Sequence, residues 1–289
     1  MVYLNAGDNY QGTFFYTLFK HRVVSEFVNQ MKFDAMSLGN HEFDDGVNGL
    51  APFLKATEST PTVGCNVDVS KEPSLDSIRK SIVLERNGRK IGIIGYLTPD
   101  TRFLASVGRV QIDDEIKCIR KEANRLIADG VNILIGLGHS GLEKDIAIAR
   151  AIPELDLIVG GHSHSFLSPT YGTNDPQLST DTPVDKYPVV IKQDKSVTLV
   201  VQAYAFGKYL GVLDLQFDKQ GLIKTWSGTP IFLNSTNKGM EVKEVSILIC
   251  LIQIRYFNEA SNCQFNFRSR PKNSHCLRRD ESSFKWHMP

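Results

Sequence analysis

Residues 38–46 read LGNHEFDDG, a stretch in which an apolar run gives way to densely spaced polar side chains. An apolar run ends at Leu38, Gly39 turns the chain, and five of the next six side chains are polar. Asn, Asp and Gly are typical of a surface turn. Asn, His and Asp also carry the nitrogen and oxygen atoms that bind divalent metals. Alone, the stretch favours the surface turn, so the other segments must decide.

The same pattern recurs three times: a short apolar run, a glycine, then polar side chains. It occurs in VYLNAGD (2–8), in VNILIGLGHSG (131–141) and in LDLIVGGHSH (155–164). Short runs rich in Ile, Val and Leu are typical of buried strands. Each polar cluster therefore follows the carboxyl end of a predicted strand.

Helical patterns lie between these strands and predict an α/β fold. Residues 113–130 place an apolar stripe on one helix face, with Asp113 or Asp114 as cap and Gly130 as stop. Tyr16–Met31 is a second predicted helix. Asn87-Gly88 predicts a two-residue hairpin, and residues 188–226 predict further strands. In open α/β sheets, ligands bind at the carboxyl ends of strands, where the polar clusters lie.

The composition is that of an ordinary soluble globular protein. The chain has 289 residues, 42% hydrophobic and 22% charged, with a formal net charge of +1. Near-zero charge gives no reason to expect nucleic acid as a partner. Five cysteines without short paired spacing favour neither a zinc cluster nor a complete disulfide framework. No window reaches the ~20 apolar residues of a transmembrane segment.

Four histidines at equivalent strand ends indicate a metal site: His41, His139, His162 and His164. A lone His beside an apolar run is usually a core or surface residue, but four of them, joined by Asp8 and Asn40, favour ligation. Dinuclear hydrolases hold two ions that share a bridging carboxylate, and Asp8 suits that role. Asn40, His139 and His162 would complete one ion's shell.

Five stretches occur in the order found in one protein family: GDNYQGT (7–13), GNHEFDDG (39–46), GHSG (138–141), GGHSHSFL (160–167) and VVQAYAFGKYLG (200–211). On these, the chain resembles the calcineurin-like metallophosphatases, and among them closely the ecto-5′-nucleotidases. The resemblance covers residues 3–235. It implies an α/β metallophosphatase sandwich, two β-sheets flanked by helices, with its first strand missing. The expected domain is therefore 1–235, incomplete at its N-terminus.

The resemblance also implies residue roles. His41 looks like the stabiliser of the transition state, oriented by Asp44. Two divalent ions, expected to be Zn²⁺, would be held by Asp8, Asn40, His139, His162 and His164. For His164, a position behind the ligands or facing solvent is the alternative to ligation of the first ion. Glu42 and Asp45 are expected to be structural or exposed, and Lys208 to serve packing or the surface.

The sequence departs from the family in three places. The family's first strand carries an Asp-x-His motif that ligates the first ion, and this motif occurs nowhere here. We therefore expect an impaired first metal site. Nothing after residue 235 resembles the family's base-binding C-terminal domain, and 236–289 is expected to be an unrelated, disordered tail. The family implies an extracellular, secreted or lipid-anchored location, although from this sequence we expect neither a signal peptide nor an anchor.

The expected function is metal-dependent hydrolysis of nucleoside 5′-monophosphates, AMP to adenosine and phosphate, by metal-activated water. The partner is then a small-molecule nucleotide. Two alternatives stay open: an apyrase or nucleotide-sugar diphosphatase of the same family, and a non-catalytic fragment that binds metal or nucleotide. The sequence leaves the oligomeric state and the substrate-binding residues open.

Overall fold

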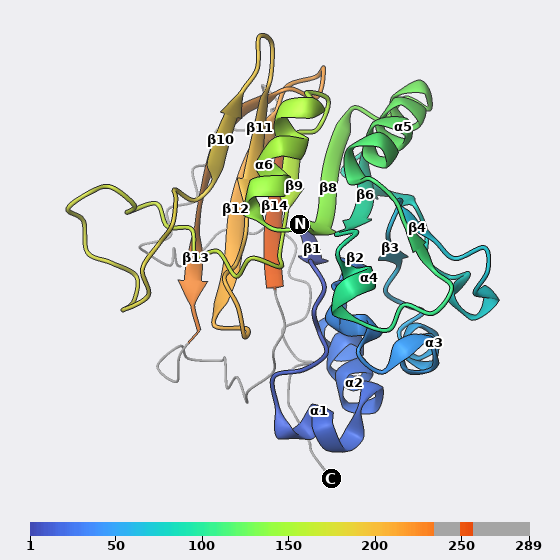
Figure 1. Cartoon of the computed structure of the whole chain (residues 1–289). Helices are drawn as coiled ribbons and strands as arrows, with labels where there is room; N and C mark the ends of the chain where they lie inside the picture. Colours follow the sequence, from blue (N-terminus) through green and yellow to red (C-terminus); the bar gives the residue numbers. More distant parts are fainter. Residues whose placement is uncertain (234–248, 257–289) are drawn as a thin grey trace, which may run out of the picture. The chain divides into compact units, whose positions relative to one another are not determined.

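The computed structural model describes residues 1–233 and 249–256, which belong to one compact unit. Two six-stranded sheets form its centre (Figure 1). The first sheet has, in spatial order, β13 (Ile223–Phe232), β12 (Tyr209–Phe217), β14 (Ile249–Tyr256), β1 (Val2–Asn5), β2 (Ala35–Ser37) and β3 (Thr62–Val63). The second has β10 (Val189–Lys192), β11 (Val197–Val201), β9 (Leu157–Val159), β8 (Ile133–His139), β6 (Arg89–Leu97) and β5 (Ser81–Arg86). A small third sheet pairs β4 (Val67–Asp68) with β7 (Gln111–Ile112).

Six helices and two short 3₁₀ turns connect the described strands. The helices are α1 (Phe14–Phe19), α2 (His21–Met31), α3 (Gly46–Ala56), α4 (Thr101–Leu104), α5 (Glu115–Ala128) and α6 (Leu142–Ala151), and the 3₁₀ turns are η1 (His41–Phe43) and η2 (Pro73–Leu75). The main core lies between the sheets, where Leu4 and Ala35 of the first sheet join Ile93 and Ile135 of the second in one buried cluster. On the other face of the first sheet, Met36 belongs to a second cluster with α2 and α3. Because successive strand residues point to opposite faces, β2 serves both cores. The predicted two-sheet sandwich flanked by helices is confirmed.

Local sequence signals explain several elements. The Asp114 side chain caps α5 by accepting from the Lys117 backbone N–H at 2.9 Å. Gly130 follows the helix with a φ of 78°, as the glycine stop signal predicts. Asn87 and Gly88 both have positive φ between β5 and β6, the geometry of a two-residue hairpin turn.

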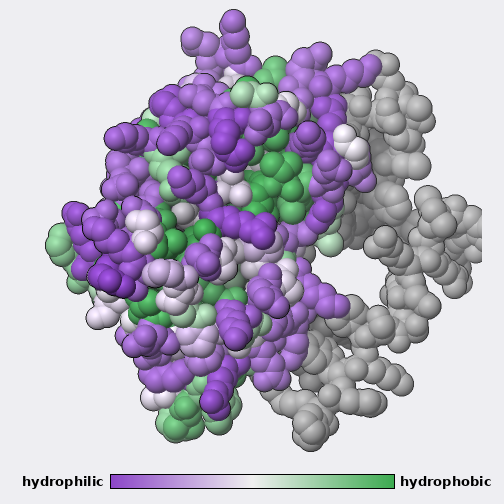
Figure 2. All heavy atoms as spheres, turned by 90° about the vertical axis from the view of Figure 1, so that its right-hand side faces the viewer, coloured by the Kyte–Doolittle hydropathy of each residue, from purple (hydrophilic) through white to green (hydrophobic). Residues whose placement is uncertain are grey.

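The single helix predicted over Tyr16–Met31 is instead two helices, α1 and α2. The helix is interrupted at Lys20, whose φ is 54°. Lys20 ends α1 and precedes α2, so the helical hydrogen bonding does not continue from one helix into the other. Four large apolar side chains of α1 are exposed: Phe14, Phe15, Leu18 and Phe19. Figure 2 shows hydrophobic side chains at the lower end of the visible face, at the level where α1 lies in Figure 1.

β14 is a difference from the expected tail, because Ile249–Tyr256 form a strand inside the first sheet. β14 pairs in parallel with β12 and antiparallel with β1 (Figure 1). A continuous apolar run suits a central strand, which is the physical reason for this departure. The other residues of that predicted tail, 236–248 and 257–289, lie outside the described residues. Within the described ranges, no helix combines the length and apolar character needed to cross a bilayer.

Candidate metal centre

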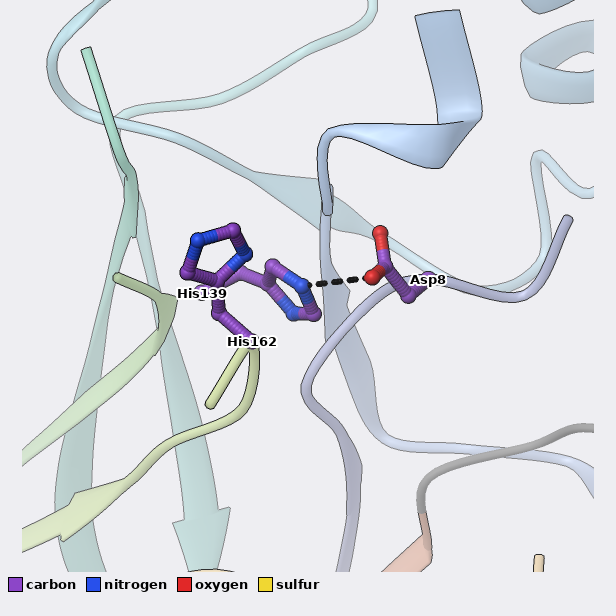
Figure 3. A group of neighbouring side chains, drawn as sticks. All are labelled: Asp8, His139 and His162. Carbon is purple, nitrogen blue, oxygen red and sulfur yellow. Dashed lines mark ion pairs between the residues drawn. The ribbon is translucent and has the colours of Figure 1, made fainter. Parts of the chain in front are cut away.

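Three predicted ligands converge at the carboxyl ends of strands from both sheets. Asp8 follows β1, His139 is the last residue of β8, and His162 follows β9. One ligand atom from each lies within 4.8 Å of the others, and Figure 3 shows the three side chains facing one another. A carboxylate and two imidazoles form a donor set that suits zinc and related ions.

Two glycines let the loop of Asp8 reach the loop of Asn40. A side chain on Gly7 would lie 2.3 Å from the backbone nitrogen of Gly39, and one on Gly39 would lie 2.1 Å from the Asp8 carboxylate. The two backbones therefore touch where only hydrogen fits. This close approach explains why a glycine precedes each polar cluster at these two strand ends.

The Glu42 side chain connects these two loops through hydrogen bonds. Its carboxylate is fully buried and accepts backbone N–H bonds from Gly39, Asp8, Asn9 and Tyr10. Burial, together with the charge of Asp8, raises the pKa of Glu42 against the lowering effect of these bonds. Glu42 is structural, as predicted. Asp45 is structural too, since it accepts from the Tyr16 hydroxyl at 2.8 Å and pairs with Lys20 at 2.9 Å.

The geometry of His139 fits a cation. Its ring is 1% exposed, and its Nδ1 lies 2.7 Å from the Ala6 carbonyl oxygen. A carbonyl oxygen only accepts, so Nδ1 carries the proton, and in the neutral ring Nε2 presents a lone pair. Nε2 lies 2.8 Å from Oδ2 of Asp8, an ion-pair distance. Two acceptor atoms that close require a positive charge beside them, which either a proton on Nε2 or a bound metal ion would supply.

The electrostatics of the pair agree with this requirement. Burial raises the pKa of Asp8, but the charge and hydrogen bond of His139 outweigh it and lower the pKa to about 2. Burial lowers the pKa of His139, but the charge of Asp8 outweighs it and raises the pKa. The carboxylate is therefore ionised near neutral pH, and the site attracts positive charge.

His162 brings Asn40 into the group. Nδ1 of His162 donates to the amide oxygen of Asn40 at 2.9 Å. Burial, and then the charge of His139, lower the pKa of His162, so its ring stays neutral as a metal ligand must.

Three of the five predicted ligands have left-handed backbone conformations. The φ of Asp8 is 59°, that of His162 is 76° and that of His164 is 49°. Side-chain-bearing residues adopt such conformations at a cost, and they concentrate at functional sites. The fold therefore stores strain at the residues that form this centre.

A small cavity of about 90 Å³ opens onto the group and is lined by Asp8, His41, His139, His162 and His164, among others. His164 lies outside the three-residue group but borders the same space. Nδ1 of His41 lies 2.8 Å from the Asp44 carboxylate, and the His41 backbone N–H donates to Asp8 at 3.0 Å. The pairing inferred for His41 and Asp44 is therefore present in the structure.

Several cavity residues were not predicted from the sequence, and two of them, Gln11 and Phe206, have long side chains. Gln11 lines the cavity, and its side chain donates to Asp44. Phe206 lines it from the loop before β12. Gln11 belongs to GDNYQGT and Phe206 to VVQAYAFGKYLG, two of the stretches that carry the family resemblance. Their place in these stretches is the sequence signal that could have marked them as site residues. Lys208 of the same loop as Phe206 is not among the residues that line the cavity, and it pairs with Asp181 at 2.6 Å.

Comparison with known proteins assigns the chain to a family. The calcineurin-like phosphoesterase family matches residues 1–166. An apyrase of Anopheles gambiae is 42% identical over 247 residues, covering 82% of this chain and 43% of the relative. The 5′-nucleotidase of Mus musculus is 42% identical over 242 residues, covering 82% of this chain and 41% of the relative.

A solved structure agrees with these relatives. The 5′-nucleotidase precursor from Thermus thermophilus superposes with a TM-score of 0.74 at 36% identity, covering 79% of this chain and 44% of that one. The chain thus spans less than half the length of these relatives. Matched over more than half of its residues, the chain belongs to the calcineurin-like phosphoesterase family.

Proposed function

We propose that this chain hydrolyses nucleoside 5′-monophosphates, with AMP giving adenosine and phosphate. The observation that carries the proposal is the meeting of Asp8, His139 and His162 at strand ends, with His41 beside them on one cavity. The names of the mouse and Thermus relatives point to the same substrate class. A phosphoryl group is small enough for the cavity, and the nucleoside would extend from its mouth.

Asp8, Asn40, His139 and His162 would hold one divalent ion, which we propose to be Zn²⁺. When bound, such ions act as Lewis acids on a phosphoryl oxygen and make water a nucleophile at neutral pH. The chain's own residues prepare the site: the carboxylate of Asp8 offsets cationic charge, and the Ala6 carbonyl fixes the ring of His139. His164 would complete a second, weaker site that shares Asp8.

His41 would stabilise the charge that develops on the phosphoryl group. Its Nδ1 is held by Asp44, so Nε2 is the ring nitrogen available to the cavity. A ring held in place by a carboxylate can direct Nε2 at the negative charge that develops on the phosphoryl group. Gln11 donates to the same Asp44 carboxylate and so fixes the partner of His41.

An apyrase is the second candidate, because the Anopheles relative with that name matches as closely as the mouse 5′-nucleotidase. An apyrase would release phosphate from ATP and ADP. A non-catalytic, metal-binding chain is the third candidate. The second ion has two proposed ligands, His164 and the shared Asp8, whereas the first ion has four, so the second ion would bind more weakly.

The test combines metal analysis with phosphate release from AMP, ADP and ATP by the full 289-residue chain. We expect bound metal, AMP hydrolysis that a chelator abolishes, and recovery of the activity on adding Zn²⁺. His139→Ala should lose both metal and activity. His21→Ala is the matched control, because His21 lies on α2 and does not line the cavity. Release from ADP but not AMP would favour the apyrase, and bound metal without any release would favour the third candidate.

A further inference from the structure

Phe206 is an exposed aromatic residue held in an unusual backbone conformation. It lies in the loop between β11 and β12, its φ is 58°, and its side chain is 66% exposed. Bulky residues rarely adopt positive φ. Among the residues that the structure describes, Phe206 belongs to neither of the two buried hydrophobic clusters.

The loop around Phe206 is anchored on both sides. The Tyr204 ring packs edge-on against Phe166 at 5.9 Å and Tyr209 at 5.8 Å. Ala205 is 3% exposed, and its carbonyl oxygen accepts from the Lys208 backbone N–H at 3.1 Å. The fold thus buries the residue before Phe206 and closes a turn around it, while leaving its ring in solvent.

The ring lies at the mouth of the metal centre. Phe206 lines the cavity together with Asp8, His41 and His139. Its ring meets that of His164 edge-on at 5.5 Å between centroids, with an interplanar angle of 69°. An edge contact leaves the faces of the Phe206 ring available to another flat group. A phosphate ester bound at the metal centre would place its alcohol portion beside this ring.

We infer that Phe206 binds the planar part of the leaving alcohol, so that this domain prefers phosphate monoesters whose alcohol carries an aromatic ring. The inference rests on the proposed phosphatase function of the same centre. Every nucleobase presents a flat face, so stacking on Phe206 does not choose among bases. It distinguishes nucleotides from phosphate esters without a ring system. The aromatic surface comes from the metal-binding domain itself.

A packing role for Phe206 makes different predictions. If the ring served to hold His164, its loss would lower metal content and reduce turnover of all substrates equally. If the ring stacks on the leaving alcohol, its loss would change the ratio between substrates and leave metal content intact. Phe206→Leu separates the roles, because Leu keeps apolar bulk beside His164 and lacks the flat face.

The kinetic test compares AMP with ribose 5-phosphate, which has the same sugar phosphate without the base. For Phe206→Leu we expect the ratio of kcat/KM for AMP to that for ribose 5-phosphate to fall roughly tenfold, mainly through the KM for AMP. Phe206→Tyr should retain the ratio. Phe103→Leu is the matched control, because Phe103 is 76% exposed on α4 and does not line the cavity. An unchanged ratio in Phe206→Leu would overturn the inference.

A binding test without turnover keeps the two proposals separable. Phe206→Trp places a fluorophore at the cavity mouth, and Phe103→Trp serves as its control. We expect saturable quenching of the Phe206→Trp signal by adenosine and none by ribose. Quenching in a chain that hydrolyses no phosphate ester would support the stacking surface and reject the proposed function. Hydrolysis of AMP with equal responses to adenosine and ribose would reject the stacking surface alone.

Discussion

The two sides of the cavity differ in how their side chains are held. On one side, His139 is buried and hydrogen-bonded to the Ala6 carbonyl oxygen, and His162 is hydrogen-bonded to the Asn40 side chain. On the other, His164 makes no hydrogen bond among the described residues, and its ring contacts the exposed Phe206. We call the side with His139 and His162 the interlocked side, because these hydrogen bonds hold its rings in place. We call the side with His164 and Phe206 the open side, and we propose that it takes the weaker ion and the leaving group.

Asp8 belongs to both sides, so one carboxylate meets two unequal sets of neighbours. Asp8 touches the interlocked side through His139, while its other carboxylate oxygen accepts from the His41 backbone N–H. Metal affinity depends on how many ligands are held in place before the ion arrives. We therefore expect most of the binding free energy for metal to come from the interlocked side.

The largest expected effect comes from His139→Ala compared with His164→Ala. Removing His139 should abolish stable metal binding and lower kcat/KM for AMP by on the order of 1,000-fold, because Lewis-acid stabilisation contributes several kcal/mol. Removing His164 should retain the better-bound ion and cost roughly tenfold. Metal content and AMP hydrolysis are measured on the same samples, with circular dichroism to confirm folding. Equal metal loss in both variants would contradict the inequality of the two sides.

The next effect concerns His41, which lies between the two sides. His41→Ala should lower kcat for AMP by on the order of 100-fold, as for removal of one transition-state donor. Metal content should stay unchanged, because the His41 side chain is not in the ligand group. Asp44→Asn should give a smaller loss in kcat, since it weakens only the orientation of His41. A fall in metal content with His41→Ala would show that the residue belongs to the ligand set instead.

The sequence predicted much of this centre because strand ends leave a local signature. The apolar runs that end at glycine predicted the strand ends at which Asp8, His139 and His162 converge, and Asn87-Gly88 predicted the hairpin. The break at Lys20 was missed because apolar spacing continues across it. The pairing of β14 depends on contacts between residues far apart in the chain, and no local pattern specifies them. Phe206 was missed because an exposed ring is recognised only beside the cavity it lines.

A third prediction concerns the buried carboxyl behind the interlocked side. Asp145 is fully buried, and its carboxylate accepts from Tyr96 at 2.7 Å and from Gln202 at 3.0 Å. Burial raises the pKa of Asp145 to about 7, against the lowering effect of these two bonds. The folded chain thus holds this proton more tightly than the unfolded chain, whose pKa is 3.8. The contribution of Asp145 to stability is complete below pH ~4 and is lost as pH rises through about 7.

Denaturant unfolding of the metal-free chain at a series of pH values measures this contribution. The free energy of unfolding should fall across that window, and Asp145→Asn should remove on the order of 2 kcal/mol of the fall. Asn keeps an acceptor for Tyr96 and carries no charge at any pH. The two proteins are compared by the slope of the free energy of unfolding against pH. A changed contact with Gln202 would shift the free energy of unfolding equally at every pH and leave this slope unchanged. An unchanged slope would mean that Asp145 is ionised in the folded chain across the window.

The smallest effect is expected from Lys208, two residues beyond Phe206 on the open side. Its ammonium pairs with Asp181 at 2.6 Å, and the side chains are 34% and 14% exposed. Partly exposed ion pairs contribute ~1 kcal/mol or less, so Lys208→Ala should lower the free energy of unfolding by no more than that. The turn at Phe206 is closed by the backbone N–H of Lys208, which the substitution keeps. The kcat/KM for AMP should therefore stay within about fivefold of the wild type, the factor that corresponds to ~1 kcal/mol. A larger loss, confined to AMP and absent for ribose 5-phosphate, would show that the ammonium and not only the Phe206 ring acts on the nucleoside.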